Sequence, residues 1–125
     1  LASVVGKDND GRLLAQLAAD AGIDIALLQY SQQRPTTTKT RIISRNQHMM
    51  RIDEQVCDEL YVPEEHPFID AVLRYLQIQK PDVLIFEDYN KGLLKENVIQ
   101  RITAHCNEVG IVTAVDPKMH IFVSY

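Results

Sequence analysis

Short apolar runs that alternate with amphipathic helical patterns constrain the fold of this 125-residue chain most strongly. An apolar run at 1–5 is followed by a helical pattern and then by a second apolar run at 23–30. Strand, helix, strand is the order typical of a mostly parallel sheet with helices on its faces. Asp8–Gly11 supplies turn and cap residues, and Gly22 fits the end of a helix. The expected buried stripe of this helix consists of Leu13, Leu14, Leu17, Ala18 and Ala21.

The second half of the chain repeats the alternation. Pro67 is expected as the first residue of a second helix, which Pro81 ends. The apolar run 83–86 predicts a strand with helices over both faces, and 111–115 predicts the last strand. We therefore interpret 82–118 as a βαβ unit of the core sheet. The expected buried residues of its two neighbouring helices are Phe68, Ile69, Val72, Leu73 and Leu76, then Leu94, Val98, Ile102, Cys106 and Val109 before Gly110.

Residues 36–53 differ in character and predict a β hairpin. The β-branched run 36–45 alternates, so Lys39, Arg41 and Arg45 are expected on one strand face. Asn46 and Gln47 are the expected turn, and 48–53 the returning strand. The cations could grip an anionic ligand, or they could protect a solvated edge strand from aggregation.

Composition and charge exclude several classes of protein. Hydrophobic residues make up 46% and charged residues 24%, as in ordinary globular domains. A net charge of −4 argues against non-specific binding of nucleic acid, and the longest apolar run is too short to span a bilayer. Cys57 and Cys106 stand outside any metal-binding spacing, and we interpret them as reduced thiols of a cytoplasmic protein. No metal site built from protein ligands is predicted.

Two strand ends carry the residues best suited to chemistry. Asp88 and Lys91 follow one strand, and Asp116 and Lys118 follow the next. Ligands bind outside the carboxyl ends of parallel strands, where a carboxylate can hold Mg²⁺ and a lysine can meet phosphate. This combination suits phosphoryl transfer. Structural alternatives stay open, because Asp88 could cap a helix and Asp116 could form a turn.

Five segments together resemble the ribokinase-like (PfkB) carbohydrate kinases. Within that family they are most similar to the heptose 7-phosphate kinase domains of ADP-heptose synthesis, which supplies lipopolysaccharide precursors. These segments are 6–11, 35–47, 51–53, 88–92 and 116–118. The resemblance implies phosphorylation of a sugar hydroxyl with ATP and Mg²⁺, under a small β lid at 36–53 that often pairs with a second subunit.

The same resemblance implies roles for individual residues. It places Asp88 and Lys91 near the transferred phosphate, and Asp116 and Lys118 on the nucleotide side. The expected sugar-phosphate contacts are Lys39, Arg41, Arg45, Asn46 and Gln47.

The family's pattern also extends beyond this sequence. An upstream Gly-Gly-Ala-x-Asn segment and a downstream Gly-Ala-Gly-Asp motif, which carries the catalytic base, have no counterpart here. We therefore expect residues 1–125 to be the central part of one kinase domain and to be inactive alone. The alternatives are a related kinase for another small sugar or nucleoside, and a non-catalytic module that binds sugar phosphates.

Overall fold

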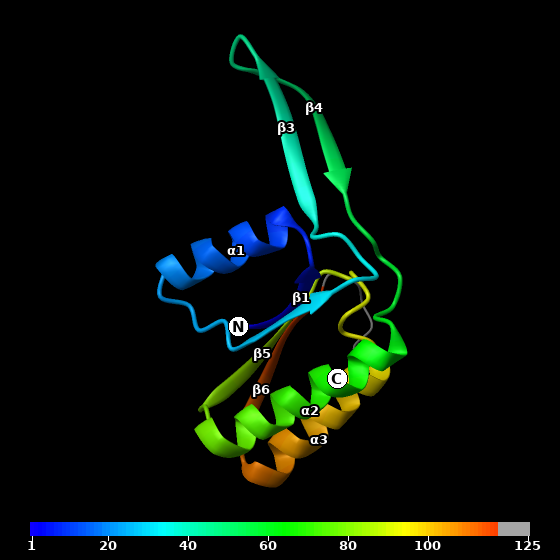
Figure 1. Ribbon diagram of the computed structural model, residues 1–125. Coiled ribbons are helices and arrows are strands. Elements are labelled where there is room, and N and C mark those ends of the chain that lie inside the picture. Colours follow the sequence, from blue (N-terminus) through cyan, green and yellow to red (C-terminus); the bar gives the residue numbers. More distant parts are fainter. Residues whose placement is uncertain (118–125) are drawn as a thin grey trace. The chain divides into compact units, whose positions relative to one another are not determined.

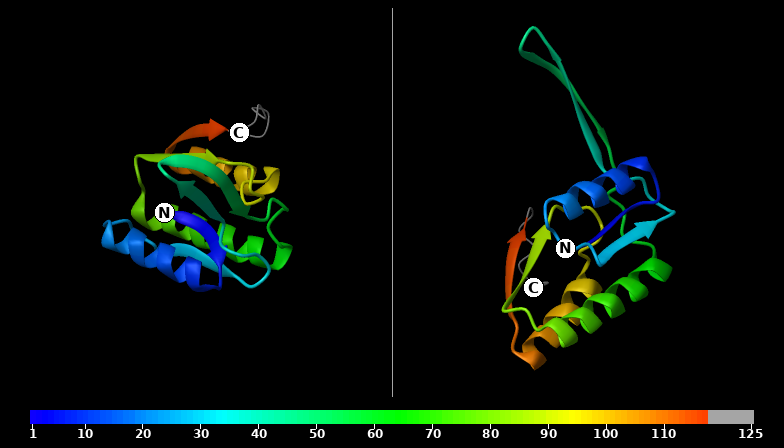
Figure 2. Two further views of the ribbon diagram at one scale, coloured as in Figure 1. Left: turned by 90° about the horizontal axis from the view of Figure 1, so that it is seen from above. Right: turned by 60° about the vertical axis from the view of Figure 1, so that its left-hand side comes forward.

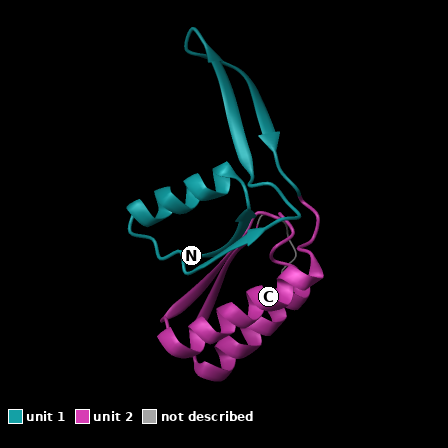
Figure 3. Ribbon diagram, in the orientation of Figure 1, with its two compact units in different colours: residues 1–56 teal, residues 57–125 magenta. Residues whose placement is uncertain are grey.

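The computed structural model describes residues 1–117, which form an α/β structure with short parallel and antiparallel sheets and three helices. Contacts divide the chain into two compact units, residues 1–56 and 57–125 (Figures 1 and 3). No helix within the described residues has the length and apolar character needed to cross a membrane.

The first unit begins with the predicted strand, helix and strand. β1 (Ala2–Gly6) and β2 (Leu27–Ser31) pair in parallel, so that Gly6 lies opposite Ser31. Between them, α1 (Asn9–Asp20) is capped by Asp8, whose carboxylate accepts the Gly11 N–H at 2.7 Å. The predicted cap is confirmed. β2 begins later than predicted, because residues 23–25 have no regular structure and a turn follows them, in which the Leu28 N–H donates to the carbonyl of Ile25.

The expected apolar stripe of α1 is largely wrong. Leu13 and Leu17 are 56% and 57% exposed, whereas α1 buries Gly11, Ala15 and Ala18. The reason is the close approach of the helix to the end of β1. A Cβ atom on Gly11 would lie only 2.3 Å from the carbonyl oxygen of Gly6, so small residues occupy the packed side.

The β hairpin of the first unit comprises β3 (Thr38–Ser44) and β4 (Gln47–Glu54) and projects from the rest of that unit (Figure 2). Its turn is formed by Arg45 and Asn46, one residue earlier than predicted. Both have positive φ angles, 47° and 62°, as a type I′ hairpin turn requires. Arg45 therefore lies in the turn and does not share a strand face with Lys39 and Arg41.

The second unit contains α2 (Val62–Gln79), β5 (Val83–Asp88), α3 (Glu96–Val109) and β6 (Val112–Pro117). β5 and β6 pair in parallel, and α2 and α3 lie side by side (Figures 1 and 2). Most of the residues that the sequence predicts to be buried in α2 and α3 are buried. Residues buried in this unit include Phe68, Ile69, Val72, Leu76, Phe86, Val98, Ile102 and Cys106.

Two predictions for this unit are wrong. α2 starts at Val62 with Pro63 in its first turn, and Pro67 lies inside the helix. Pro63 is tolerated in the first turn because the first N–H groups of a helix have no partner within that helix. Within residues 57–117, no helix covers the other face of β5, where Val83 and Ile85 are exposed.

A partly buried network of hydrogen bonds around Asp8 and Thr36 lies in the first unit. The Thr36 hydroxyl donates to one oxygen of Asp8 at 2.7 Å and accepts the Gly6 N–H at 2.9 Å. The Thr36 N–H donates to the other Asp8 oxygen. The N–H groups of Thr36 and Gly11 and the Thr36 hydroxyl lower the pKa of Asp8, because they stabilise its charged form.

Replacing Thr36 by valine tests the contribution of this hydrogen-bond network to stability. Thr36→Val keeps the shape but removes the donor to Asp8 and the acceptor for Gly6, so we expect a loss of about 1–3 kcal/mol in the free energy of unfolding. Urea denaturation measures it. Thr37→Val at the exposed neighbouring position is the control, with an expected change within about 0.5 kcal/mol. Equal losses of unfolding free energy for the two substitutions would contradict a stabilising role of this hydrogen-bond network.

Candidate functional site

The carboxyl ends of β5 and β6 lie side by side. Their register pairs Glu87 with Asp116 and Asp88 with Pro117. The two predicted strand ends are therefore neighbours, as expected from the βαβ connection. Because side chains alternate along a strand, Asp88 belongs to the face of Phe86, which is buried, whereas Glu87 and Asp116 share the opposite, exposed face. Sequence reasoning overlooked Glu87, although alternation from Asp88 could have identified it.

Asp88 begins a turn and does not cap a helix. Its Oδ1 accepts the Asn90 N–H at 2.8 Å, whereas the residue that caps α3 is Lys95. Lys91 lies in the loop between the two and places its Nζ 3.4 Å from Sγ of Cys57. Asp88 and Lys91 therefore belong to one short segment at the end of β5. Asp116 is exposed near the end of β6, and Lys118 lies outside the described residues.

The hairpin has a charged face and an apolar face. The register places Lys39 opposite Asp53 and Arg41 opposite Arg51, so these four side chains share one face. Arg51 pairs with Asp53 at 2.7 Å. Lys39 and Arg41 are thus brought together as predicted, with Arg51 as the third cation of the face. Arg45 and Asn46 lie at the turn and Gln47 begins β4. The opposite face carries Ile42, Met50 and Ile52.

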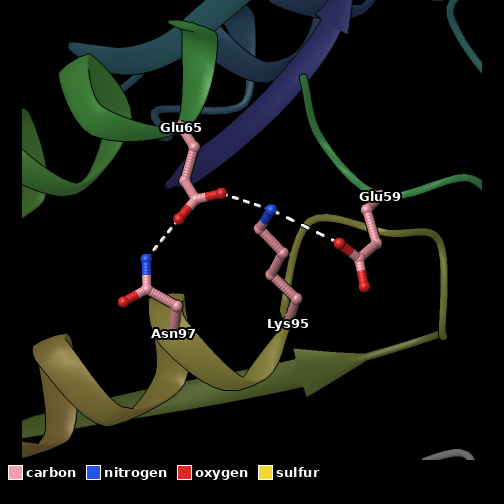
Figure 4. A network of polar contacts seen from close by, with 4 residues as sticks. All are labelled: Glu59, Glu65, Lys95 and Asn97. Carbon is pink, nitrogen blue, oxygen red and sulfur yellow. Dashed lines mark hydrogen bonds and ion pairs between the residues drawn. The ribbon is translucent and has the colours of Figure 1, made fainter. Parts of the chain in front are cut away.

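An ionic network around the buried side chain of Glu65, in the second unit, was not predicted from the sequence (Figure 4). Glu65, in the first turn of α2, is 3% exposed and forms an ion pair with Lys95. Lys95 also reaches Glu59 at 3.4 Å, and the Asn97 side-chain amide donates to Glu65. The sequence gives little signal for this network, because its members are about 30 residues apart and an acid early in a helix is common.

The charges of this network stabilise each other. Burial alone raises the pKa of Glu65, but hydrogen bonds from Lys95 and Asn97 outweigh it and hold that pKa below its ordinary value of 4.5. The hydrogen bond from Lys95 to Glu65 raises the pKa of Lys95 above its ordinary value of 10.5, against the opposing effect of burial. Both groups are therefore charged at neutral pH.

No cluster of three or more His, Cys, Asp or Glu side chains suited to a metal ion occurs within residues 1–117. Mg²⁺ usually needs no such cluster, because it binds to one or two carboxylates and completes its shell with water and substrate phosphates. Glu87 and Asp116 on one face, and Asp88 on the other, supply oxygen ligands of that kind at the strand ends.

Comparison with known proteins gives full-length matches to this chain. It is 36% identical over 125 residues to the Bifunctional protein HldE of Methylobacillus flagellatus, and 33% and 32% identical to the proteins of that name from Helicobacter pylori and Geobacter sulfurreducens. The chain spans only about a quarter of the length of these relatives (25%, 27% and 25%). No family model matches the sequence.

A solved structure, titled Crystal Structure of Sa239, is similar in fold. The TM-score is 0.59 at 12% sequence identity, over 94% of this chain and 36% of that chain. This similarity supports the α/β architecture alone.

The buried ion pair predicts a pH-dependent loss of stability. Glu65→Gln keeps the size of the side chain but leaves Lys95 without its buried partner, so we expect about 2 kcal/mol less unfolding free energy at neutral pH. The Glu65 contribution is present above pH 4.5 and is lost as the pH falls through the lowered pKa of the folded state. The difference between wild type and Glu65→Gln should therefore shrink below pH 4.5.

Urea denaturation at a series of pH values measures this difference. Glu108→Gln is the matched control, because that side chain is 76% exposed and should change stability by no more than about 0.5 kcal/mol. A difference for Glu65→Gln that stays constant as the pH falls would contradict the assigned role of the carboxylate.

Proposed function

We propose that residues 1–125 are the central part of a ribokinase-like kinase domain. The intact protein would transfer a phosphoryl group from ATP to a sugar phosphate, with the anomeric hydroxyl of heptose 7-phosphate as the acceptor. The observation that carries the proposal is the match of the whole chain, at 30–36% identity, to proteins named Bifunctional protein HldE. The family resemblance of the strand-end and hairpin motifs supports the same assignment, as does the adjacency of the β5 and β6 ends.

In this proposal the strand ends bind the nucleotide and the transferred phosphate. Lys91 neutralises charge on the transferred phosphoryl group, and Asp88 lies beside it. Asp116 and Lys118 contact the nucleotide. Carboxylates at the strand ends, Asp88 among them, would hold Mg²⁺, and the ion would offset negative charge on the phosphates. Because the strand pattern places Asp88 and Asp116 on opposite faces, we assign them to different parts of the ligand.

The hairpin is proposed to be the lid over the sugar phosphate. Lys39 and Arg41 share a charged face, and arginine can contact a phosphate through two parallel hydrogen bonds. Arg45 and Asn46 would contribute from the turn, and Gln47 from the start of β4. The apolar face, with Ile42, Met50 and Ile52 at 41–51% exposure, suits a homodimer contact through the lid. ATP and sugar phosphates as substrates fit a cytoplasmic location.

Turnover measurements test the proposed activity. The intact protein should phosphorylate heptose 7-phosphate with ATP and Mg²⁺, whereas residues 1–125 alone should show no turnover, since they contain no candidate for the catalytic base. Appreciable turnover by residues 1–125 would refute their description as part of a larger catalytic domain. Binding of the sugar phosphate without turnover by the intact protein would favour a non-catalytic module.

Charge reversal in the hairpin tests the substrate class. In the intact protein, Arg41→Glu and Arg45→Glu should each weaken binding of the sugar phosphate by about 10- to 100-fold, because each loses a charge-assisted hydrogen bond. Binding of the corresponding neutral sugar should change much less. Arg74→Glu, on the exposed side of α2, is the control and should leave both affinities unchanged. Equal losses for the phosphorylated and the neutral sugar would contradict the assignment to sugar phosphates.

A further inference from the structure

The segment that joins β5 to α3 has no regular structure. This strand-end loop, residues 89–95, follows Asp88 and ends at Lys95, the residue that caps α3. Asn90 and Gly92 both have positive φ angles, 52° and 77°. A loop without helix or strand hydrogen bonds depends on contacts with other segments to keep one conformation. The position of the Lys91 backbone is thus set by the contacts that hold this loop, while its Nζ also contacts Sγ of Cys57.

The middle of the strand-end loop is held by its backbone. The Leu60 N–H donates to the carbonyl oxygen of Gly92 at 2.7 Å. The two segments of the chain approach so closely that a Cβ atom on Gly92 would lie 1.9 Å from the Asp58 carbonyl oxygen. The segment 58–60 therefore supports the backbone at Gly92, the residue that follows Lys91 in the sequence, and Leu60 itself is 1% exposed.

The far end of the loop is held by Glu65. One of its oxygens pairs with Lys95 Nζ and the other accepts a hydrogen bond from the Asn97 amide (Figure 4). The carboxylate therefore binds two residues at the start of α3. Lys95 has no side-chain capping bond of its own and is 17% exposed. Because Glu65 is buried, water competes weakly for these bonds.

We infer that Glu65 is a positioning residue, which acts through Lys95 and Asn97 to fix the strand-end loop and with it Lys91. Glu65 and the support at 58–60 belong to one continuous stretch that leads into α2. The loop is consequently held at Gly92 and at Lys95, both on the α3 side of Lys91, while the turn at Asp88 and Asn90 holds the β5 side. Loss of the carboxylate releases the loop at Lys95, so that its α3 side is held at Gly92 instead of at two points.

The catalytic consequence rests on the proposed function. If Lys91 meets the transferred phosphate, a loop with several conformations presents it correctly for only part of the time. Misplacement of a positioned group lowers the rate of the chemical step much more than it lowers ground-state binding. A merely structural contribution to α2–α3 packing would instead change stability without separating kcat from KM.

The experiment compares Glu65→Gln, Lys95→Arg and Glu108→Gln in the intact protein, at a temperature where circular dichroism shows each to be folded. Amide hydrogen exchange is followed in peptides covering 89–95. We expect exchange there to be about tenfold faster in Glu65→Gln, with little change in Lys95→Arg, which keeps the ion pair, and none in Glu108→Gln. Exchange in Glu65→Gln equal to that of wild type overturns the inference.

Kinetics provide the second readout. With ATP and heptose 7-phosphate, kcat of Glu65→Gln should fall about 10- to 100-fold while KM for each substrate stays within about threefold, and Lys95→Arg should retain most of the wild-type kcat. An unchanged kcat in an active protein overturns the positioning role. If wild type transfers no phosphate, the proposed function fails, and loop exchange alone decides whether Glu65 fixes the loop.

Discussion

Parallel pairing of β5 and β6 is the constraint on which the candidate site depends. Parallel strands bring their carboxyl ends to one edge, so residues that are nearly 30 positions apart in the sequence become neighbours. The pairing requires a crossover connection, which α3 provides, and the apolar side of α3 packs with α2. Apolar burial in the helices thus sets the position of polar side chains at the strand ends.

Polar contacts fix the ends of helices and strands, whose positions apolar packing alone does not determine. In the first unit, the bonds among Gly6, Asp8 and Thr36 join the end of β1, the start of α1 and the approach to β3. In the second, Glu65 and Lys95 join the starts of α2 and α3. Both networks lie where a helix or strand gives way to a loop. Their hydrogen bonds and ion pairs therefore stabilise one conformation of that loop. Loops held in this way suit binding and catalysis, which need side chains in fixed positions.

The sequence predicted the order of elements well because periodicity and end signals agreed. Glycine at 110 and the alternation around Lys39 and Arg41 are local signals, and the structure confirms what they predicted. The misplaced elements are those where local signals conflict. Pro67 resembles a helix start, yet Pro63 occupies that place, and the leucines of α1 formed a better apolar stripe than the small residues that are buried.

The site was predictable to the level of strand ends and no further. Spacing along the chain shows that Asp88 and Asp116 end neighbouring strands, but the face that each occupies depends on register. Arg45 was assigned to a strand because alternation cannot identify a turn residue with positive φ. The network of Glu59, Glu65, Lys95 and Asn97 depends on tertiary packing alone, which single-sequence patterns do not encode.

A crystal structure of the intact protein with Mg²⁺, a non-hydrolysable ATP analogue and a sugar phosphate would test the central claim most directly. The account predicts the terminal phosphate of the analogue at the edge formed by β5 and β6, in contact with Nζ of Lys91, with the sugar phosphate against Lys39 and Arg41. A nucleotide bound away from that edge, with Lys91 remote from every phosphate, would contradict it.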